Sequence, residues 1–141
     1  MLFEREGRLW TICAVLALGG SCAAAIGDEV SDRAKNPDLF AAWFRSPHLV
    51  RFPDGESLQD VAARTADVLR FVLSRQEADT LVLVGHDSVN RVLLTEVLDM
   101  PLSAYWRFAQ DPCCINEIQV TGNSFQLRRM NDTAHLDVGI A

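Results

Sequence analysis

The residues best suited to chemistry lie at a junction over residues 85–88, which read Gly-His-Asp-Ser. The apolar run over 80–85 predicts a strand, and residues 89–98 predict a helix. Ligands of an open parallel sheet bind beyond the carboxyl ends of its strands. A helix that begins there directs unpaired N–H groups and a partial positive charge at the ligand. The junction therefore predicts a site for an anion or a phosphoryl group.

The four side chains of this junction have different expected parts. Gly85 lets the backbone approach a ligand closely, and His86 is able to carry a positive charge near neutral pH and to hold or protonate a phosphate oxygen. Asp87 and Ser88 follow directly and complete the candidate phosphate site. A structural histidine that hydrogen-bonds to the next turn is the alternative for His86, and the spacing leaves both interpretations open.

A second chemistry also fits the junction, because it resembles the strand–turn–helix elbow of α/β-hydrolases. Asp87 would then be the nucleophile, as in the Gly-His-Asp of aspartate-dependent dehalogenases and epoxide hydrolases, and His135 would be the nominal base. That elbow needs a small residue where Val89 stands, and a β-branched side chain crowds a strained turn. The hydrolase is therefore kept as the alternative interpretation.

The elements before and within the junction indicate an α/β domain. Asn36 and Pro37 predict the start of one helix, and Ser57, with Asp60 at the third helical position, predicts the capped start of a long one. The strand over 80–85 is apolar on both faces. Such a strand is typical of the middle of a parallel sheet with helices on either side.

The last third of the chain predicts a short helix and then a hairpin. The helix is expected over residues 102–108. Residues 115–121 and 125–130 lie on either side of a Gly-Asn pair and predict the two strands of the hairpin. The residues from Asn131 onward are expected to be irregular.

Composition and charge limit the class of protein. The chain has 141 residues, a net charge of −6, 49% hydrophobic and 23% charged residues, which is ordinary for one folded domain. The acidic balance argues against a nucleic-acid partner, which needs clustered Lys and Arg. Cys113 and Cys114 are neighbours and no Cys-x-x-Cys spacing occurs. We therefore expect buried cysteines in a reducing compartment, and neither a metal nor another cofactor.

Residues 9–26 form an uncharged run that does not match the rest of the chain. A buried core helix or strand pair ranks first, and a signal peptide that ends at the alanines of residues 23–25 ranks second. A membrane span ranks last, because Gly-Gly-Ser interrupts a run that is barely long enough. The expected location is the cytoplasm, or outside it if residues 1–25 are a signal peptide, and no membrane partner is expected.

Two motifs, taken together, resemble the phosphoglycerate mutase-like histidine phosphatase superfamily. The first is the Arg-Phe-Pro-Asp-Gly-Glu-Ser of residues 51–57, and the second is the strand with Gly-His within residues 81–91, about thirty residues later. Either motif alone is weak, and the pair is fairly specific. The resemblance covers roughly residues 27–136 and includes residues 100–102, 111–116 and 131–136.

This resemblance implies a three-layer α/β sandwich, whose mostly parallel central sheet is flanked by helices and is incomplete at its N-terminus. Residues 1–26 would be an atypical apolar segment, residues 27–136 the phosphatase-like domain and residues 137–141 a tail. The family reaction is phosphomonoester hydrolysis or phosphoryl transfer through a phosphohistidine, without a metal. A small phosphorylated metabolite or inorganic phosphate is the expected partner.

The resemblance also assigns roles to single residues. His86 matches the second histidine of the family's pocket, a catalytic residue that contacts the phosphoryl oxygens. Arg51 resembles a substrate-contacting arginine of the fructose-bisphosphatase branch, with an exposed loop arginine as the alternative. Glu56 and Ser57 are matched motif positions, expected as a buried or turn-bonding carboxylate and as a helix cap, with phosphate contacts as the lesser option. Arg91 is expected to be a structural ion-pair partner.

The chain departs from the family at the nucleophile. It has three histidines, His48, His86 and His135, and none is preceded by Arg and followed by Gly. The resemblance therefore predicts impaired catalysis, and a phosphatase, a non-catalytic phosphate-binding remnant and the hydrolase with Asp87 all stay open. A missing first strand would expose a neighbour's edge and favour a homodimer, unless residues 9–18 partly refill its place.

Overall fold

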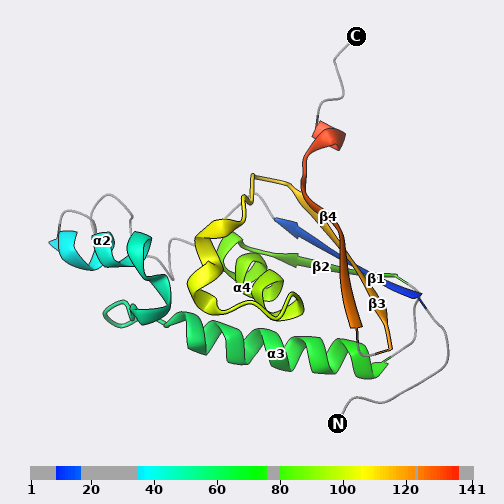
Figure 1. Ribbon diagram of the computed structural model, residues 1–141, viewed down its shortest axis with the longest axis horizontal. Helices are drawn as coiled ribbons and strands as arrows, with labels where there is room; N and C mark the ends of the chain where they lie inside the picture. Colours follow the sequence, from blue (N-terminus) through cyan, green and yellow to red (C-terminus); the bar gives the residue numbers. More distant parts are fainter. Residues whose placement is uncertain (1–8, 17–34, 76–79, 123, 137–141) are drawn as a thin grey trace.

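The computed structural model describes residues 9–16, 35–75, 80–122 and 124–136, and for residues 9–16 it describes the backbone alone. Figure 1 shows how the elements are arranged. In chain order, the α-helices (α), 3₁₀ helices (η) and strands (β) of the described residues are β1 (Leu9–Leu16), α2 (Pro37–Arg45), η2 (Pro47–Leu49), α3 (Leu58–Arg75), β2 (Thr80–Gly85), α4 (Asp87–Val97), η3 (Leu102–Arg107), β3 (Ile115–Thr121), β4 (Ser124–Asp132) and η4 (Ala134–Leu136).

The four described strands form one sheet in the order β2-β1-β3-β4. β1 runs parallel to β2 and antiparallel to β3, and β3 and β4 form an antiparallel hairpin. The hairpin is where the sequence predicts it, and Gly122 in its turn has a φ of +56°, which glycine adopts without a steric cost. The expectation of irregular chain from Asn131 is wrong, because β4 continues to Asp132 and η4 follows it. One of the three described pairings is parallel, so the expected mostly parallel sheet is not found in this part of the chain.

β2 also differs from its expected place. It is one of the two outermost strands of the described sheet and not a middle one. Its two faces differ, because Leu81 and Leu83 are half-buried whereas Val82 and Val84 keep 58% and 66% of their surface exposed. Continuous hydrophobicity reflects burial of both faces in many parallel sheets, but here the described helices cover only the leucine face.

α3 and α4 lie side by side against that face of the sheet (Figure 1). Their shared core contains apolar side chains from α3, α4 and β3, together with the Phe108 ring that follows η3: Leu69, Leu93, Leu94, Val97, Phe108, Ile118 and Val120. This packing determines where the N-terminus of α4 lies, because most residues of α4 beyond its first turn are buried. None of the helices in the described part of the chain combines the length and the apolar character that a membrane crossing requires.

A second, aromatic cluster joins α2 to η3 and α4. Trp43 of α2 meets the Tyr105 and Trp106 rings of η3 at centroid distances of 5.2 and 5.7 Å. The Trp106 indole also donates a hydrogen bond of 3.0 Å to the carbonyl of Trp43. The first of these ring pairs is tilted and the second is edge-to-face, and contacts of this kind add to the free energy gained by burial. η3 is a 3₁₀ helix at the place where the sequence predicts a short helix.

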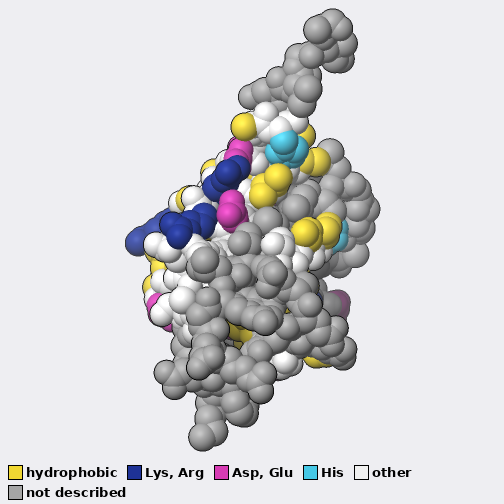
Figure 2. All heavy atoms as spheres, turned by 90° about the vertical axis from the view of Figure 1, so that its right-hand side faces the viewer, with side chains coloured by type: hydrophobic (Ala, Val, Ile, Leu, Met, Phe, Trp, Pro, Cys, Tyr) yellow, Lys and Arg dark blue, Asp and Glu magenta, His cyan; other side chains and the backbone are white. Residues whose placement is uncertain are grey.

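The charged side chains of the hairpin form mixed pairs. Arg129 of β4 lies 3.2 Å from Glu117 of β3 and 3.3 Å from Asp132. Figure 2 shows a face of the molecule on which basic and acidic side chains lie next to one another, with exposed hydrophobic side chains beside them. The basic side chains of this face therefore do not form a patch of one sign.

Candidate functional site

The predicted junction lies at the carboxyl end of β2. Gly85 ends the strand, His86 caps α4 with an extended backbone (φ −97°, ψ 164°), and Asp87 is the first residue of the helix. α4 therefore begins two residues earlier than the sequence predicts. Gly85 is in register with Leu16 of β1, so the carboxyl ends of the two parallel strands meet at this end of the sheet.

His86 is half-buried, and its ring makes no hydrogen bond or ion pair with the described residues. Its carbonyl accepts the first hydrogen bond of α4, from the N–H of Asn90 at 2.9 Å. The N–H groups of residues 87–89 have no intrahelical acceptor, as in any helix start. His86 thus stands at the N-cap position, directly before three amides without an acceptor in the helix, and within the described residues its ring makes no hydrogen bond to the next turn.

Asp87 is held by Arg91 one turn further along α4. The Arg91 Nε lies 2.8 and 2.9 Å from the two carboxylate oxygens, and its Nη1 donates to the carbonyl of Phe108. The guanidinium is nearly buried and lies over the Tyr105 and Trp106 rings, at 5.6 and 5.1 Å from their centroids. The expected ion-pair role of Arg91 is confirmed. The positive charge of Arg91 thereby compensates the negative charge of Asp87, the acidic residue in the first turn of α4.

Ser88 is oriented by η3. The buried Tyr105 donates its hydroxyl hydrogen to the Ser88 Oγ at 2.8 Å. Because the Ser88 oxygen accepts this bond, its own hydrogen is left to donate to another group. Tyr105 is a positioning residue that the sequence did not single out, since no spacing signal links it to Ser88.

Close contact with Asn90 requires a glycine at position 85. A Cβ built on Gly85 would lie 2.7 Å from the Oδ1 of Asn90. Asn90 is almost fully buried, and its Nδ2 has no hydrogen-bond partner within the described residues. The Asn90 side chain therefore has little room to move away.

Gly85→Ala is expected to lower the free energy of unfolding by about 1–3 kcal/mol, the usual cost of forcing an extra methyl group into a packed site. Urea denaturation measures this change. In an Asn90→Ala background the same substitution should cost clearly less, because the opposing oxygen is gone. An equal cost in both backgrounds would show that contact with Asn90 is not the cause.

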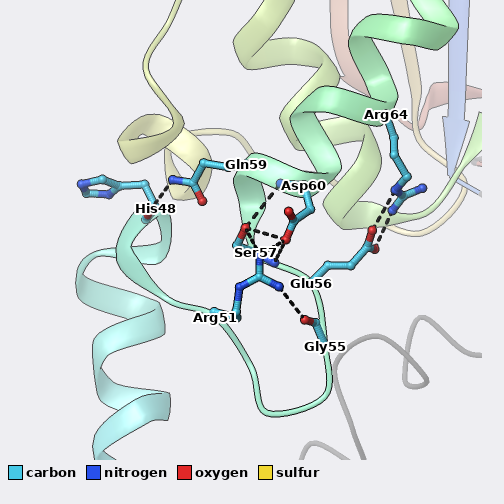
Figure 3. A network of polar contacts seen from close by, with 8 residues as sticks. All are labelled: His48, Arg51, Gly55, Glu56, Ser57, Gln59, Asp60 and Arg64. Atoms are coloured by element: carbon cyan, nitrogen blue, oxygen red, sulfur yellow. Dashed lines mark hydrogen bonds and ion pairs between the residues drawn. The ribbon is translucent and has the colours of Figure 1, made fainter.

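Arg51, Glu56 and Ser57 belong to a separate cluster at the start of α3 (Figure 3). Arg51 keeps 61% of its side chain exposed and pairs with Asp60 at 2.6 Å. It also donates to the carbonyl of Gly55 at 3.2 Å. Within the described residues, no hydrogen bond or ion pair joins this cluster to residues 85–91. The geometry matches that of an exposed loop arginine.

Ser57 and Asp60 form the capping box that the sequence predicts. The Ser57 N–H and hydroxyl donate to the Asp60 carboxylate at 2.8 and 2.7 Å, and the Asp60 N–H donates back to the Ser57 Oγ at 3.3 Å. Glu56 is exposed and not buried. It accepts two hydrogen bonds, of 2.9 and 2.7 Å, from Arg64 two turns into α3.

The capping box predicts a pH dependence of stability. The N–H and then the hydroxyl of Ser57, followed by the charge of Arg51, lower the pKa of Asp60 below its ordinary 3.8. The stabilisation is therefore present above that value and is lost as the pH falls through the lower, folded-state pKa. The melting temperature of Asp60→Asn should lie below that of the parent at neutral pH, and the two should converge under acid conditions. Asp54→Asn, an exposed carboxyl of the same loop, is the control and should give no such difference.

The other two histidines lie apart from the junction. His48 is half-buried on η2, and its Nδ1 has no partner among the described residues. Figure 3 shows its ring pointing away from the Arg51 cluster. His135 is exposed on η4. Over the described part of the chain, no three His, Cys, Asp or Glu side chains come together in a way that could hold a metal ion.

A buried amide pair, which the sequence did not reveal, connects the loop after η3 to the hairpin. Gln110 and Asn116 exchange hydrogen bonds of 3.1 and 2.7 Å. The Asn116 Oδ1 also accepts the N–H of Asn131 in β4 at 2.9 Å. Cys114 beside them is buried, and burial raises the pKa of its thiol. Cys113, by contrast, is only half-buried. No spacing rule predicts such a pairing of amides.

Comparison with known proteins agrees with the motifs at this site. Residues 27–133 match the family model of the histidine phosphatase superfamily, branch 1. The chain therefore belongs to the histidine phosphatase superfamily, and its α/β fold is that of the family's phosphoglycerate mutase-like phosphatases.

Two curated relatives and one solved structure illustrate the relationship. Phosphoserine phosphatase 1 of Hydrogenobacter thermophilus is 31% identical over 117 residues, which are 83% of this chain and 54% of that protein. Adenosylcobalamin/alpha-ribazole phosphatase of Escherichia coli is 24% identical over 107 residues, 76% of this chain and 51% of that protein. The structure of Bacillus stearothermophilus YhfR is similar with a TM-score of 0.69 and 27% identity, over 79% of this chain and 55% of that one. The chain thus spans about half the length of these relatives.

Proposed function

We propose that this chain binds a phosphate group at the junction of β2 and α4 and that it does not form a phosphohistidine. The observation that carries the proposal is His86 at the N-cap position of α4: its ring has no partner in the described residues, and the first N–H groups of the helix have no acceptor within it. An imidazolium, amide donors and the helix dipole all favour an anion. Gly85, Asp87 and Ser88 complete the site.

Two features of the junction support phosphate binding: the charge of Asp87 is compensated, and the hydroxyl of Ser88 is able to donate. The Asp87 carboxylate would repel a phosphate dianion, but Arg91 bonds both of its oxygens. The Ser88 hydroxyl keeps its hydrogen for a ligand oxygen because Tyr105 donates to it. Arg51 remains a candidate for the far side of a substrate. It would have to leave Asp60 to take this part, so we give it less weight than His86.

The second part of the proposal, that no phosphohistidine forms, rests on the residues that follow β1 next to Gly85. Leu16 of β1 is in register with Gly85, and Ala17 and Leu18 follow it in the sequence. By family resemblance, the nucleophilic histidine stands at the end of the first strand, and we propose that β1 takes the place of that strand. Leucine and alanine supply no nucleophile. Phosphomonoester hydrolysis through a phosphohistidine is therefore impaired in this chain.

We infer that the ligand is a small phosphorylated metabolite or inorganic phosphate. The names of two relatives, a phosphoserine phosphatase and an alpha-ribazole phosphatase, support this class of ligand. The free thiols of Cys113 and Cys114 favour a cytoplasmic location. The alternative with Asp87 as the nucleophile of a hydrolase is not retained, because the chain belongs to a different superfamily and Arg91 occupies that carboxylate.

Three measurements on the 141-residue chain test this function together. Phosphate and vanadate should raise the melting temperature, because a ligand that binds only the folded state stabilises it. Turnover of an aryl phosphate and covalent incorporation of labelled phosphate should both stay at background. Turnover that disappears in His86→Ala would establish an active phosphatase instead. If neither anion shifts the melting temperature, the binding proposal is wrong.

A further inference from the structure

The buried amide pair of Gln110 and Asn116 has a partner for each of its nitrogen and oxygen atoms. The Nε2 of Gln110 donates to Asn116 Oδ1 at 3.1 Å and to the carbonyl of Ala109 at 2.6 Å, and its Oε1 accepts from Asn116 Nδ2 at 2.7 Å. The Asn116 Oδ1 also accepts the N–H of Asn131. A buried polar network that is fully bonded specifies one geometry, whereas apolar side chains can repack. The amide pair therefore fixes the chain after η3 more precisely than apolar contact would.

Asn116 connects this chain segment to the sheet. It is fully buried on β3, which pairs with β1 on one side and with β4 on the other. In the register of β3 with β1 it lies opposite Ala14, two residues before the end of β1. The amide pair thus holds the segment close to the carboxyl ends of β1 and β2, where the candidate phosphate site lies.

The segment held in this way carries the backbone acceptor of Arg91. Phe108 lies two residues before Gln110, and its carbonyl accepts a hydrogen bond from the Nη1 of Arg91. The Nε of the same guanidinium bonds both carboxylate oxygens of Asp87. Because a guanidinium is planar and rigid, the direction of the Nη1 bond also determines where Nε points. A displaced Phe108 carbonyl would therefore turn Nε away from Asp87.

The thiol of Cys114 shows that the amide pair and the start of α4 are close in space. Its Sγ lies 3.5 Å from the Oε1 of Gln110. Burial raises the pKa of this thiol most, the hydrogen bond from Asn116 opposes that effect, and the negative charges of Asp111 and Asp87 raise the pKa further. The group that contacts Gln110 is therefore near enough to the helix start to be affected by the charge of Asp87.

We propose that Gln110 is a positioning residue for the phosphate site. Held by Asn116, it keeps the Phe108 carbonyl in place, and this carbonyl orients Arg91. Arg91 then compensates the charge of Asp87, which would otherwise repel a bound anion. This inference rests on the proposed function, because the charge that is compensated lies at the phosphate site. It includes no contact between Gln110 and the ligand.

An NMR signal of Arg91 measures its orientation without a ligand. The Nε–H group gives a ¹H–¹⁵N signal, which is assigned by its absence in Arg91→Met. Gln110→Met keeps the length of the side chain and removes its hydrogen bonds. It should shift the Nε–H signal towards that of an unstructured arginine and speed its exchange with water. Val120→Ala, at the other end of β3, is the matched control, because it opens a cavity in the core and leaves the amide pair intact. Its Nε–H signal should not move.

Phosphate titration measures the consequence for the site, at a temperature at which circular dichroism shows every variant to be folded. Gln110→Met should weaken phosphate binding by about two- to tenfold, the contribution of one neutral hydrogen bond. In an Arg91→Met background the same substitution should cause no further loss, because the group through which Gln110 acts is gone. Equal losses in both backgrounds would overturn the proposal. So would an Nε–H signal that stays unchanged in Gln110→Met, or that shifts equally in Val120→Ala.

The two measurements separate this inference from the proposed function. If the parent binds no phosphate, the proposed function is wrong, and the Nε–H signal still decides whether the amide pair orients Arg91. If Gln110→Met does not fold, the combination of Gln110→Met with Asn116→Leu replaces it, because the loss of both partners leaves neither amide unsatisfied. The expected shift of the signal and the expected loss of affinity are then the same.

Discussion

Replacing His86 by alanine should weaken phosphate binding about ten- to a hundredfold while leaving the free energy of unfolding almost unchanged. A hydrogen bond to a charged group is worth about 1.5–3 kcal/mol, and about 1.4 kcal/mol corresponds to a factor of ten in affinity. The ring is half-buried and makes no hydrogen bond with the described residues, so its removal breaks no polar contact among them. Calorimetric titration with phosphate measures the first quantity, and urea denaturation the second.

His135→Ala is the matched control for this experiment. It removes an exposed imidazole from η4, so it changes the histidine content without touching the start of α4. Its phosphate affinity should equal that of the parent. If both alanine variants weaken binding equally, general electrostatic attraction explains the binding. If His86→Ala binds as tightly as the parent, the amides of the helix start suffice and His86 has no part.

The elements that the sequence predicts well are those set by neighbouring residues. Ser57 and Asp60 are three residues apart, and their side chains reach each other's N–H groups whatever the rest of the fold does. The turn at Gly122 likewise fixes the pairing of β3 with β4. Arg91 reaches Asp87 across one helical turn. In each case the deciding interaction lies within a few residues of the chain.

The place of β2 in the sheet could not be predicted in the same way. The apolar side chains of a strand indicate that it is buried, but they do not indicate which strands lie beside it, because those strands come from distant parts of the chain. The pairing of Gly85 with Leu16 joins residues that lie almost seventy positions apart. The exposed face of β2 is also apolar, at Val82 and Val84. Its sequence pattern is therefore the same as that of a strand in the middle of a sheet.

The candidate site shows the same division. Its order along the chain, a strand, Gly-His and a helix start, is local and was predicted. The contacts that hold its side chains in place are not predictable in this way. Tyr105 bonds to Ser88, and the Phe108 carbonyl bonds to Arg91, each across 17 residues of the chain that include the end of α4. The early start of α4 at Asp87 has a related cause. The Asp87 side chain has a partner only if residues 87–91 are helical.

Replacing Arg91 by methionine should have the largest combined effect on stability and binding. Removing one partner of a buried ion pair costs 3–5 kcal/mol. We expect about 3 kcal/mol here, because the Asp87 side chain is 35% exposed and regains some hydration. The unpaired carboxylate then stands beside the bound anion, so phosphate affinity should fall at least tenfold. Urea denaturation and calorimetric titration measure the two effects.

A second substitution separates charge from structure in this prediction. If repulsion by Asp87 causes the loss of binding, Asp87→Asn added to Arg91→Met should restore most of the phosphate affinity, because no negative charge is left at the helix start. Stability should return only in part, since the Phe108 carbonyl still lacks its donor. Arg64→Met, which breaks the exposed pair with Glu56, is the control and should cost less than about 1 kcal/mol. If binding stays weak in the double variant, Arg91 supports binding by holding the helix start in position. Neutralising the Asp87 charge is then not the reason for its effect.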